Sequence, residues 1–444
     1  MPLEKEAFLM KKKSSAAGAR GQSIQNELVH LHLKRCWKYM RGFATWVVVG
    51  LILGVLGGLV GTAFCYGIDF ATKFRTAHLW IVWLLPFGGL FIAWMYALRG
   101  QHPTNTNGVL LAIHTPTAIP PATGPMIFIG SIVTHFFGGS AGREGAALQL
   151  GGVLGSRFAS LFRFKNHEED KHIVVMAGMS AVFSSLFGAP LTAVVFAMEV
   201  ASVGILHFSA IIPCLTSSLT AVYLSQWLGI TAEVFPLSAA AAFSFANIGS
   251  AALIAAVCAA VSIVYCVSLR QGGHFFAHLL PNPYLRIFCG GLAVALLTAA
   301  LGTGDYNGAG MNVIAAAIGG TAKPEAFILK LIMTVLTMCC GYEGGEIVPA
   351  MFIGATLGCV LGNLLGLPVG LGAAVGLLCM FCGSLNCPIS SILLGVELFG
   401  AGNIQFFAIA AAISYILSAN FGLYEEQKIV YSKLRPKYIN RYTE

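Results

Sequence analysis

The residues most suited to chemistry lie in GGSAGREGAALQLGG, residues 138–152, where Arg143 and Glu144 stand together between glycines. The stretch GREGAALQLGGVLG is typical of a helix start, because its glycines leave backbone amides uncovered and AALQL favours a helix. The first four amides of a helix have no partner within it, and their partial positive charge attracts anions. We therefore expect an anion-binding site at this helix start.

Glu144 has a natural place in such a site, because its carboxylate is itself an anion at a helix N-terminus. It would occupy the site when ionised and leave it when protonated. An ionisable group buried in a membrane is costly and is a functional candidate by default. This hypothesis makes Glu144 both a gate and a proton carrier. The alternative is a static Arg143–Glu144 ion pair or a plain helix cap.

A second helix start of the same kind is predicted at residues 344–349, GGEIVP. Two helix starts from two parts of the chain, both aimed at the middle of a membrane, would bind an anion through backbone amides alone. A bare arginine would hold the anion too tightly for release. Such a site therefore suits transport.

An internal repeat relates the two parts. Pro190 is followed nine residues later by Glu199, and Pro388 is followed nine residues later by Glu397. The surroundings also match, with FSSLFGAPLTAVVFAMEV beside FCGSLNCPISSILLGVEL and LQLGGVLG beside MFIGATLG. Repeats with interrupted segments at matching places are typical of the binding site of a transporter.

The composition indicates which elements position these residues. The chain has 444 residues, of which 57% are hydrophobic and 10% charged, against about 25% charged in a soluble domain. Long apolar runs of the length that spans a membrane occupy residues 45–64, 79–98 and 252–267. Shorter segments, cut by glycine and proline, lie near residues 124–140, 346–365 and 366–382. We therefore predict an all-α polytopic membrane protein with broken, tilted helices.

The formal net charge of +8 is concentrated at the two ends of the chain. Positive residues that flank membrane spans stay in the cytoplasm, so both termini are predicted to be cytoplasmic. Topology explains this charge more simply than nucleic-acid binding does. We also predict a cytoplasmic loop at residues 157–171, RFASLFRFKNHEEDK. The predicted parts are a basic cytosolic segment (1–42), a first membrane repeat (43–235), a second membrane repeat (236–423) and a short cytosolic tail without a regulatory domain (424–444).

The sequence resembles the CLC family of anion channels and transporters. The features that carry the resemblance are the GREG motif, the GGEIVP element, the two proline-to-glutamate repeats and a tyrosine near the C-terminus, and they occur in the same order. The resemblance covers roughly residues 43–435. It implies a fold of two inverted-topology repeats and a homodimer with one anion pathway per subunit. It also implies that Glu144 is the external gating glutamate. The residues that it implies for anion binding are Thr106, Asn107, Gly108, Arg143, Gly145, Ala146, Ile347, Val348, Phe352 and Tyr424.

Departures from the chloride-carrying members bear on which anion is carried. Ala146 follows GREG where those members have proline, and Thr106 replaces their filter serine. Glu346 stands where they have a small or apolar residue. GGEIVPAMFIGATLG, with Phe352 after its proline, is more similar to the fluoride/proton antiporters of the family. Against that branch, Val348 stands where a threonine is common, and the first filter loop, which the resemblance places near residues 105–109, lacks the methionine often found there.

The internal proton glutamate of chloride/proton exchangers is expected near residues 227–230, where no acid aligns, although Glu233 is close. Its absence fits both the fluoride branch and a channel. Among the remaining polar residues, Glu199 and Glu397 end matching helices, and we expect them to have a cytoplasmic-face or capping role rather than to take part in transport chemistry. We expect His135 to be a packed helix residue and Lys330 to extend its ammonium group toward the membrane surface.

We therefore interpret the chain as a CLC-family anion transporter of a bacterial inner membrane, surrounded by lipid and without cofactor, metal or enzymatic activity. Proton-coupled halide exchange with fluoride leaving the cell is favoured. Chloride or nitrate transport, by a channel or an exchanger, stays open. A cation-coupled solute symporter is a further alternative, because broken inverted repeats serve those proteins too.

Overall fold

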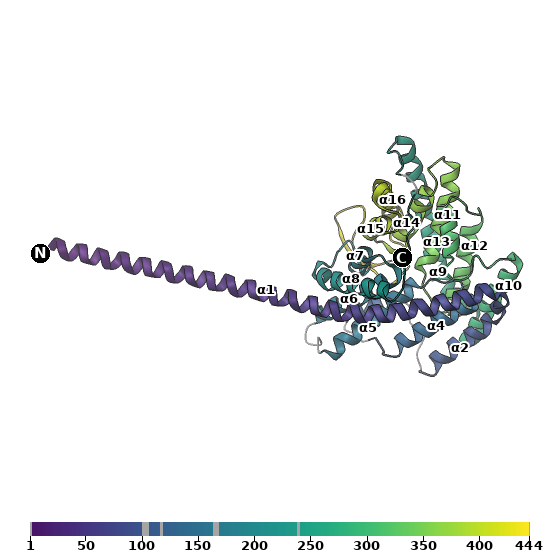
Figure 1. Ribbon diagram of the computed structural model, residues 1–444, viewed down its shortest axis with the longest axis horizontal. Helices are drawn as coiled ribbons and strands as arrows, with labels where there is room; N and C mark the ends of the chain where they lie inside the picture. Colours follow the sequence, from purple (N-terminus) through teal and green to yellow (C-terminus); the bar gives the residue numbers. More distant parts are fainter. Residues whose placement is uncertain (1, 100–105, 116–118, 163–167, 238–239, 444) are drawn as a thin grey trace. The chain divides into compact units, whose positions relative to one another are not determined.

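The computed structural model describes residues 2–99, 106–115, 119–162, 168–237 and 240–443 (Figure 1). It consists of two compact units, Met1–Val49 and Gly50–Glu444. Helix α1 (Pro2–Ala77) makes up the first unit and begins the second. Every site described below lies within the second unit. Residues 163–167 of the predicted cytoplasmic loop and Asn105 of the first filter loop lie outside the described residues.

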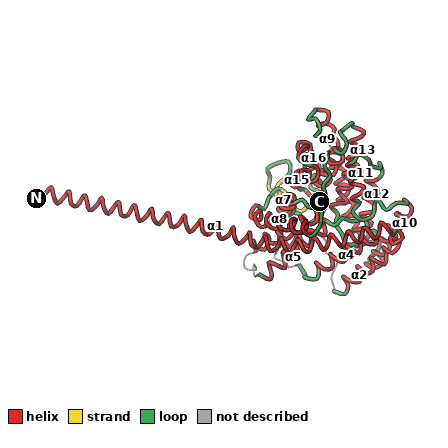
Figure 2. Tube along the Cα trace, viewed as in Figure 1, coloured by secondary structure: helices red, strands yellow, loops and turns green. Residues whose placement is uncertain are grey.

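The second unit is built almost entirely of helices (Figure 2). The first half of the chain contributes α2 (Leu85–Ala97), α3 (Thr106–His114), α4 (Thr123–Phe137), α5 (Glu144–Leu161), α6 (Glu168–Phe187), α7 (Pro190–Glu199) and α8 (Ile211–Trp227). The second half contributes α9 (Phe245–Leu279), α10 (Pro283–Leu301), α11 (Met311–Ile318), α12 (Ala326–Cys339), α13 (Ile347–Leu364), α14 (Leu371–Leu385), α15 (Pro388–Phe399) and α16 (Ile404–Leu417). Short 3₁₀ turns are η1 (Leu79–Leu84), η3 (Phe208–Ala210) and η4 (Ala401–Asn403).

Six helical segments among the described residues are long and apolar enough to cross a membrane. They are His32–Ala77, Leu79–Ala97, Phe208–Trp227, Phe245–Leu279, Pro283–Leu301 and Ile347–Leu364. Several other apolar helices have only 10–17 residues, among them α4, α7 and α15. Helices this short cannot span about 30 Å of hydrocarbon at 1.5 Å per residue. The predicted all-α fold with broken helices is confirmed.

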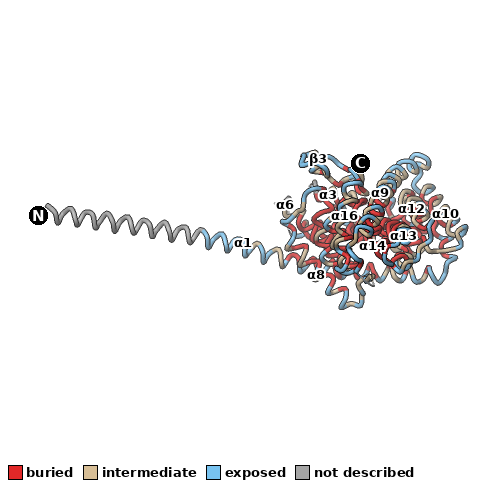
Figure 3. Tube along the Cα trace, turned by 90° about the horizontal axis from the view of Figure 1, so that it is seen from above, coloured by how far each residue is buried: buried red, intermediate tan, exposed pale blue. Residues whose placement is uncertain are grey.

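Glycines at matching positions of the two halves bring helix pairs into close contact. A Cβ added to Gly151 of α5 would overlap the carbonyl oxygen of Gly178 in α6. In the second half, a Cβ added to Gly354 of α13 would overlap the carbonyl oxygen of Gly376 in α14. Small residues allow helix backbones to approach in this way inside a membrane. The pairs α5–α6 and α13–α14 form the buried interior of the unit (Figure 3).

The two halves also cap each other's helices. The Glu397 carboxylate of α15 accepts hydrogen bonds from the Leu191 and Thr192 amides at the start of α7, at 2.8 and 2.9 Å. Reciprocally, the Glu199 carboxylate of α7 accepts hydrogen bonds from the amides of Ile389 and Ser390 at the start of α15, at 3.1 and 2.9 Å. The capping role expected for both glutamates is confirmed, and each carboxylate serves the helix of the other half.

Three short strands, which the sequence analysis did not predict, attach the tail to the helices. Strand β2 (Lys428–Tyr431) pairs parallel with β1 (Ser202–Val203) and antiparallel with β3 (Tyr438–Tyr442). The Gln427 side chain donates hydrogen bonds to the carbonyls of Val200 and Leu385, one from each half. Lys433 donates to the Asn386 side chain at 2.5 Å, and its burial lowers its pKa to about 8.

Replacing Gly354 by alanine should destabilise the protein, because the new methyl group has no space at the α13–α14 contact. Overpacking of this kind costs about 1–3 kcal/mol, so thermal unfolding in detergent should occur at a lower temperature. Gly249 of α9 is the matched control, since a Cβ there meets no atom within 4 Å. Gly249→Ala should leave the unfolding temperature unchanged or raise it slightly. Equal behaviour of the two variants would contradict the proposed tight contact.

Candidate functional site

The predicted helix starts of the two halves meet at one point. The Gly142 amide donates to the Gly345 carbonyl at 2.7 Å, and the Gly345 amide donates to the Gly142 carbonyl at 2.8 Å. This isolated antiparallel bridge lies directly before α5 and α13. A Cβ on Gly145 would stand 2.8 Å from the Gly345 Cα, so glycine is needed for this approach. The first amides of both helices are therefore brought to the same place, as the sequence predicted.

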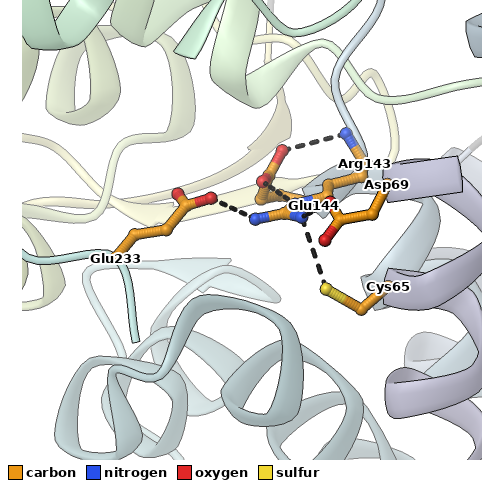
Figure 4. Close-up of polar contacts among 5 residues, drawn as sticks. All are labelled: Cys65, Asp69, Arg143, Glu144 and Glu233. Atoms are coloured by element: carbon orange, nitrogen blue, oxygen red, sulfur yellow. Dashed lines mark hydrogen bonds and ion pairs between the residues drawn. The ribbon is translucent and has the colours of Figure 1, made fainter. Parts of the chain in front are cut away.

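Glu144 is the first residue of α5, and its side chain is almost completely buried. One carboxylate oxygen, Oε2, accepts a hydrogen bond from the Arg143 amide at 3.0 Å. The other, Oε1, lies 3.3 Å from Arg143 Nε (Figure 4). The contacts of the static alternative, an ion pair with Arg143 and a capped amide, are thus both present. The carboxylate lies at the helix start, which is also the position from which the gate hypothesis begins.

The Arg143 guanidinium has further partners that the sequence did not indicate. It forms an ion pair with Glu233, from the segment after α8, and donates to Cys65 of α1 at 3.4 Å (Figure 4). Asp69, also of α1, lies 3.8 Å away. Because Glu233 pairs with Arg143 independently, movement of Glu144 would not leave a buried guanidinium without a counter-ion. Arg143 would therefore keep an ionised partner, Glu233, if Glu144 moved away.

The start of α3 approaches the same region. Gln149 of α5 donates from Nε2 to the buried Thr106 hydroxyl at 3.0 Å. The Thr106 side chain also lies near the buried Tyr424 hydroxyl. Asn107 accepts a hydrogen bond from the Glu426 amide at 3.5 Å. The structure thus brings the predicted first filter loop and the late tyrosine together, with Gly108 in the first turn of the same helix.

Tyr424 is held by the tail. The Thr443 hydroxyl donates to the Tyr424 carbonyl at 2.6 Å, and the Gln427 amide donates to it at 3.0 Å. A second tyrosine, Tyr265 of α9, donates its hydroxyl proton to the Glu346 carbonyl at 2.9 Å and so fixes the residue before α13. Tyr265 lies in an ordinary apolar run, and no feature of its sequence context marks it as a site residue.

On α13, the predicted residues Ile347, Val348 and Phe352 are all buried. The Phe352 ring lies edge-on to Tyr306, with centroids 6.3 Å apart, and Lys330 Nζ lies 5.1 Å from its centroid. The remaining predicted residues, Gly145 and Ala146, occupy the first turn of α5 beside the bridge to Gly345.

The expectation that Lys330 reaches the membrane surface was wrong. Its side chain is fully buried, and Nζ donates to the carbonyls of Tyr306 and Gly308 at 3.1 and 2.5 Å. The loop between α10 and α11 supplies these acceptors inside the protein, so the ammonium group needs no water. His135 is a buried helix residue, as expected, with Nδ1 2.8 Å from the Ser131 carbonyl.

Comparison with known families and structures gives consistent results. A family described as "Voltage gated chloride channel" matches residues 88–419. The "Chloride/fluoride channel protein" of Pseudomonas syringae pathovar tomato is 32% identical over 398 residues, which are 88% of this chain and 88% of that protein. The "H(+)/Cl(-) exchange transporter ClcA" of Yersinia pestis is 24% identical over 393 residues, covering 79% of this chain and 80% of that protein.

Two solved structures share the fold. A CLC-type fluoride/proton antiporter superposes with a TM-score of 0.83 and 33% identity, covering 86% of this chain and 98% of that chain. A slow cyanobacterial Cl⁻/H⁺ antiporter superposes with a TM-score of 0.72 and 17% identity, covering 84% of this chain and 94% of that chain. At this identity the second comparison concerns the fold alone.

Removing the Arg143 charge should be far more damaging than neutralising Glu233. Arg143→Met leaves the buried Glu144 carboxylate without a counter-ion, a change that costs about 3–5 kcal/mol when one partner of a buried pair is lost. Glu233→Gln keeps an acceptor for Arg143 and should cost less. Thermal unfolding in detergent measures both. Adding Glu144→Gln to Arg143→Met should restore part of the loss, and the absence of any restoration would contradict a buried charge at Glu144.

Proposed function

The chain belongs to the voltage-gated chloride channel (CLC) family of membrane proteins, and on this premise we propose that it exchanges a halide for protons, with Glu144 as gate and proton acceptor. Fluoride leaving the cell is the favoured direction and substrate. The observation that carries the proposal is the position of Glu144: a buried carboxylate at the junction of two helix starts.

The gate follows from competition between two anions for the same amides. Ionised Glu144 covers the Arg143 amide at the start of α5, where a halide would otherwise bind. Protonation removes the negative charge and with it the main attraction to the helix start. The neutral side chain then swings aside, and an anion takes its place. When the proton leaves, the carboxylate returns and displaces the anion, so one movement couples the two substrates.

The anion would be bound by several groups that converge on this place. The amides of α3, α5 and α13 supply hydrogen-bond donors without a full positive charge, and the Tyr424 hydroxyl supplies another. Backbone amides suit a transported ion, because release must remain fast. The involvement of Thr106, Asn107 and Gly108, and of Gly145, Ala146, Ile347 and Val348, is part of this proposal.

Fluoride is favoured by residues of the second helix start and by the relatives. Glu346 and Phe352 stand in the GGEIVPAMF element that resembles the fluoride/proton antiporters. The Pseudomonas syringae relative is named a chloride/fluoride channel protein, and the structure that matches with 33% identity is a fluoride/proton antiporter. Chloride is the second candidate, because Val348 replaces the threonine common in that branch. The proposed setting is a bacterial plasma membrane, with both termini cytoplasmic and a homodimeric assembly.

Glu144→Gln should abolish proton coupling, because the amide side chain cannot bind and release a proton near neutral pH. Purified protein in liposomes would be given a fluoride or a chloride gradient while external pH is recorded. Wild type should move protons with fluoride faster than with chloride. Glu144→Gln should conduct anions without proton movement. Glu325→Gln, at an exposed residue before α12, is the matched control and should behave as wild type. Normal proton pumping by Glu144→Gln would exclude the gate role.

A further inference from the structure

A cavity of about 430 Å³ leads from the exposed end of α9 to the start of α13. Its outer part is lined by His274 and Glu425, which are exposed, and by Arg270. Its inner part is lined by Glu343 and Glu346, together with Asn107 and Gln149 of the candidate site. The cavity therefore joins the surface around the tail to the place where the anion is proposed to bind.

The charges along this cavity favour protons over anions. Arg270 is already paired with Glu425, with Nε and Oε1 3.2 Å apart. Among the described residues, no ion pair within 4.0 Å involves Glu343 or Glu346. The inner end thus has two carboxyl groups without a cationic partner. A lining of this kind repels a halide and attracts a positive charge.

Glu343 is placed to take part in proton transfer. Only 5% of its surface is exposed. Glu346, three residues later in the chain, is the neighbouring carboxyl group. The buried Tyr96 side chain of α2 lies beside the carboxyl group of Glu343. Its Cγ packs over Gly130 of α4, where an added Cβ would come within 2.7 Å. The titratable groups around it are therefore Tyr96 and Glu346, with His274, Arg270 and Glu425 farther out along the cavity.

The neighbouring carboxyl group is also open to a proton. The Oε2 atom of Glu346 is buried and has no hydrogen-bond partner among the described residues. It lies against Gly145, where an added Cβ would be 3.1 Å away. An unpartnered carboxylate oxygen at the inner end of a polar cavity is costly unless it binds a proton or an ion.

We propose that this cavity is the proton route from the tail side of the protein and that Glu343 is the carboxyl group that takes up protons from it. A hydronium ion in the cavity protonates the Glu343 carboxylate and leaves water behind. The same proton then passes to Glu346 and on to Glu144, and each donor returns to its ionised form. No other bond is made or broken. This inference rests on the proposed proton-coupled exchange.

The test compares proton and anion fluxes in liposomes for wild type and three variants. Glu343→Gln keeps the shape of the side chain but cannot carry a proton, so its proton flux at a fixed fluoride gradient should fall at least about tenfold. Glu343→Asp keeps a carboxyl group and should retain most of the coupling. Tyr96→Phe removes only the hydroxyl group and should also remain coupled, whereas a purely structural Glu343–Tyr96 contact predicts that it fails.

The outcomes separate this inference from the proposed function. Wild type without proton movement would refute proton-coupled exchange itself. Coupled wild type with unchanged coupling in Glu343→Gln would refute the role of Glu343 alone. A slower anion flux with an unchanged proton-to-anion ratio would also overturn it, because Glu343 would then shape the anion pathway.

Water access can be measured without transport. Cys339 lines the cavity and is partly exposed, so a membrane-impermeant methanethiosulfonate reagent should modify it from the tail side. The experiment uses a Cys36→Ala background, since Cys36 is also exposed, and mass spectrometry to locate the label. Labelling in inverted membrane vesicles supports the route. An unlabelled Cys339, or labelling only from the opposite face, would overturn it.

Discussion

The backbone bridge between Gly142 and Gly345 is the contact on which the rest of the site depends. Two hydrogen bonds, of 2.7 and 2.8 Å, hold the starts of α5 and α13 against each other. Each start presents amides that its own helix cannot satisfy. Placed in a low-dielectric interior, unsatisfied amides require an anion, and the chain supplies one in Glu144. The proposed gate role of Glu144 therefore depends on bringing two helix ends together inside the protein.

Carboxylates also satisfy helix starts at a second place in the structure. Glu199 and Glu397 satisfy the starts of α15 and α7, each reaching across to the other half of the chain. Here the carboxylate belongs to a different helix from the amides that it covers, and a second hydrogen bond holds it in each case. Glu144, by contrast, covers the amide of the residue next to it and is itself the first residue of the helix whose start it covers. This local position distinguishes a candidate gate from the caps that join the two halves.

Local features of the sequence were sufficient to predict both helix starts, the repeat and a capping role for Glu199 and Glu397. These predictions depend on glycine, proline and charge at short spacing, which act within one or two helical turns. That each glutamate caps a helix of the other half was not predicted, and the positions of Thr106 and Tyr424 in the site came from the family resemblance alone. Three contacts could not be predicted. They are the pairing of Glu233 with Arg143, the hydrogen bond from Tyr265 to Glu346, and the carbonyl acceptors of Lys330. Each comes from a segment far away in the chain, and nothing in its own neighbourhood indicates the contact. The tail sheet escaped prediction for the same reason, since its partner strand β1 has only two residues.

Charge balance around Arg143 bears on the proposed coupling of an anion to protons. One guanidinium group faces three carboxylates, those of Glu144, Glu233 and Asp69. If all were ionised, the cluster would already carry excess negative charge. Two like charges 4 Å apart repel by about 4 kcal/mol at an effective dielectric constant of 20, so a halide entering beside them would be strongly opposed. Protonation of Glu144 removes one of these charges from the place that the halide must occupy. A proton and a halide that enter together leave the net charge of the cluster unchanged, whereas a halide alone would make it more negative, and this favours joint entry.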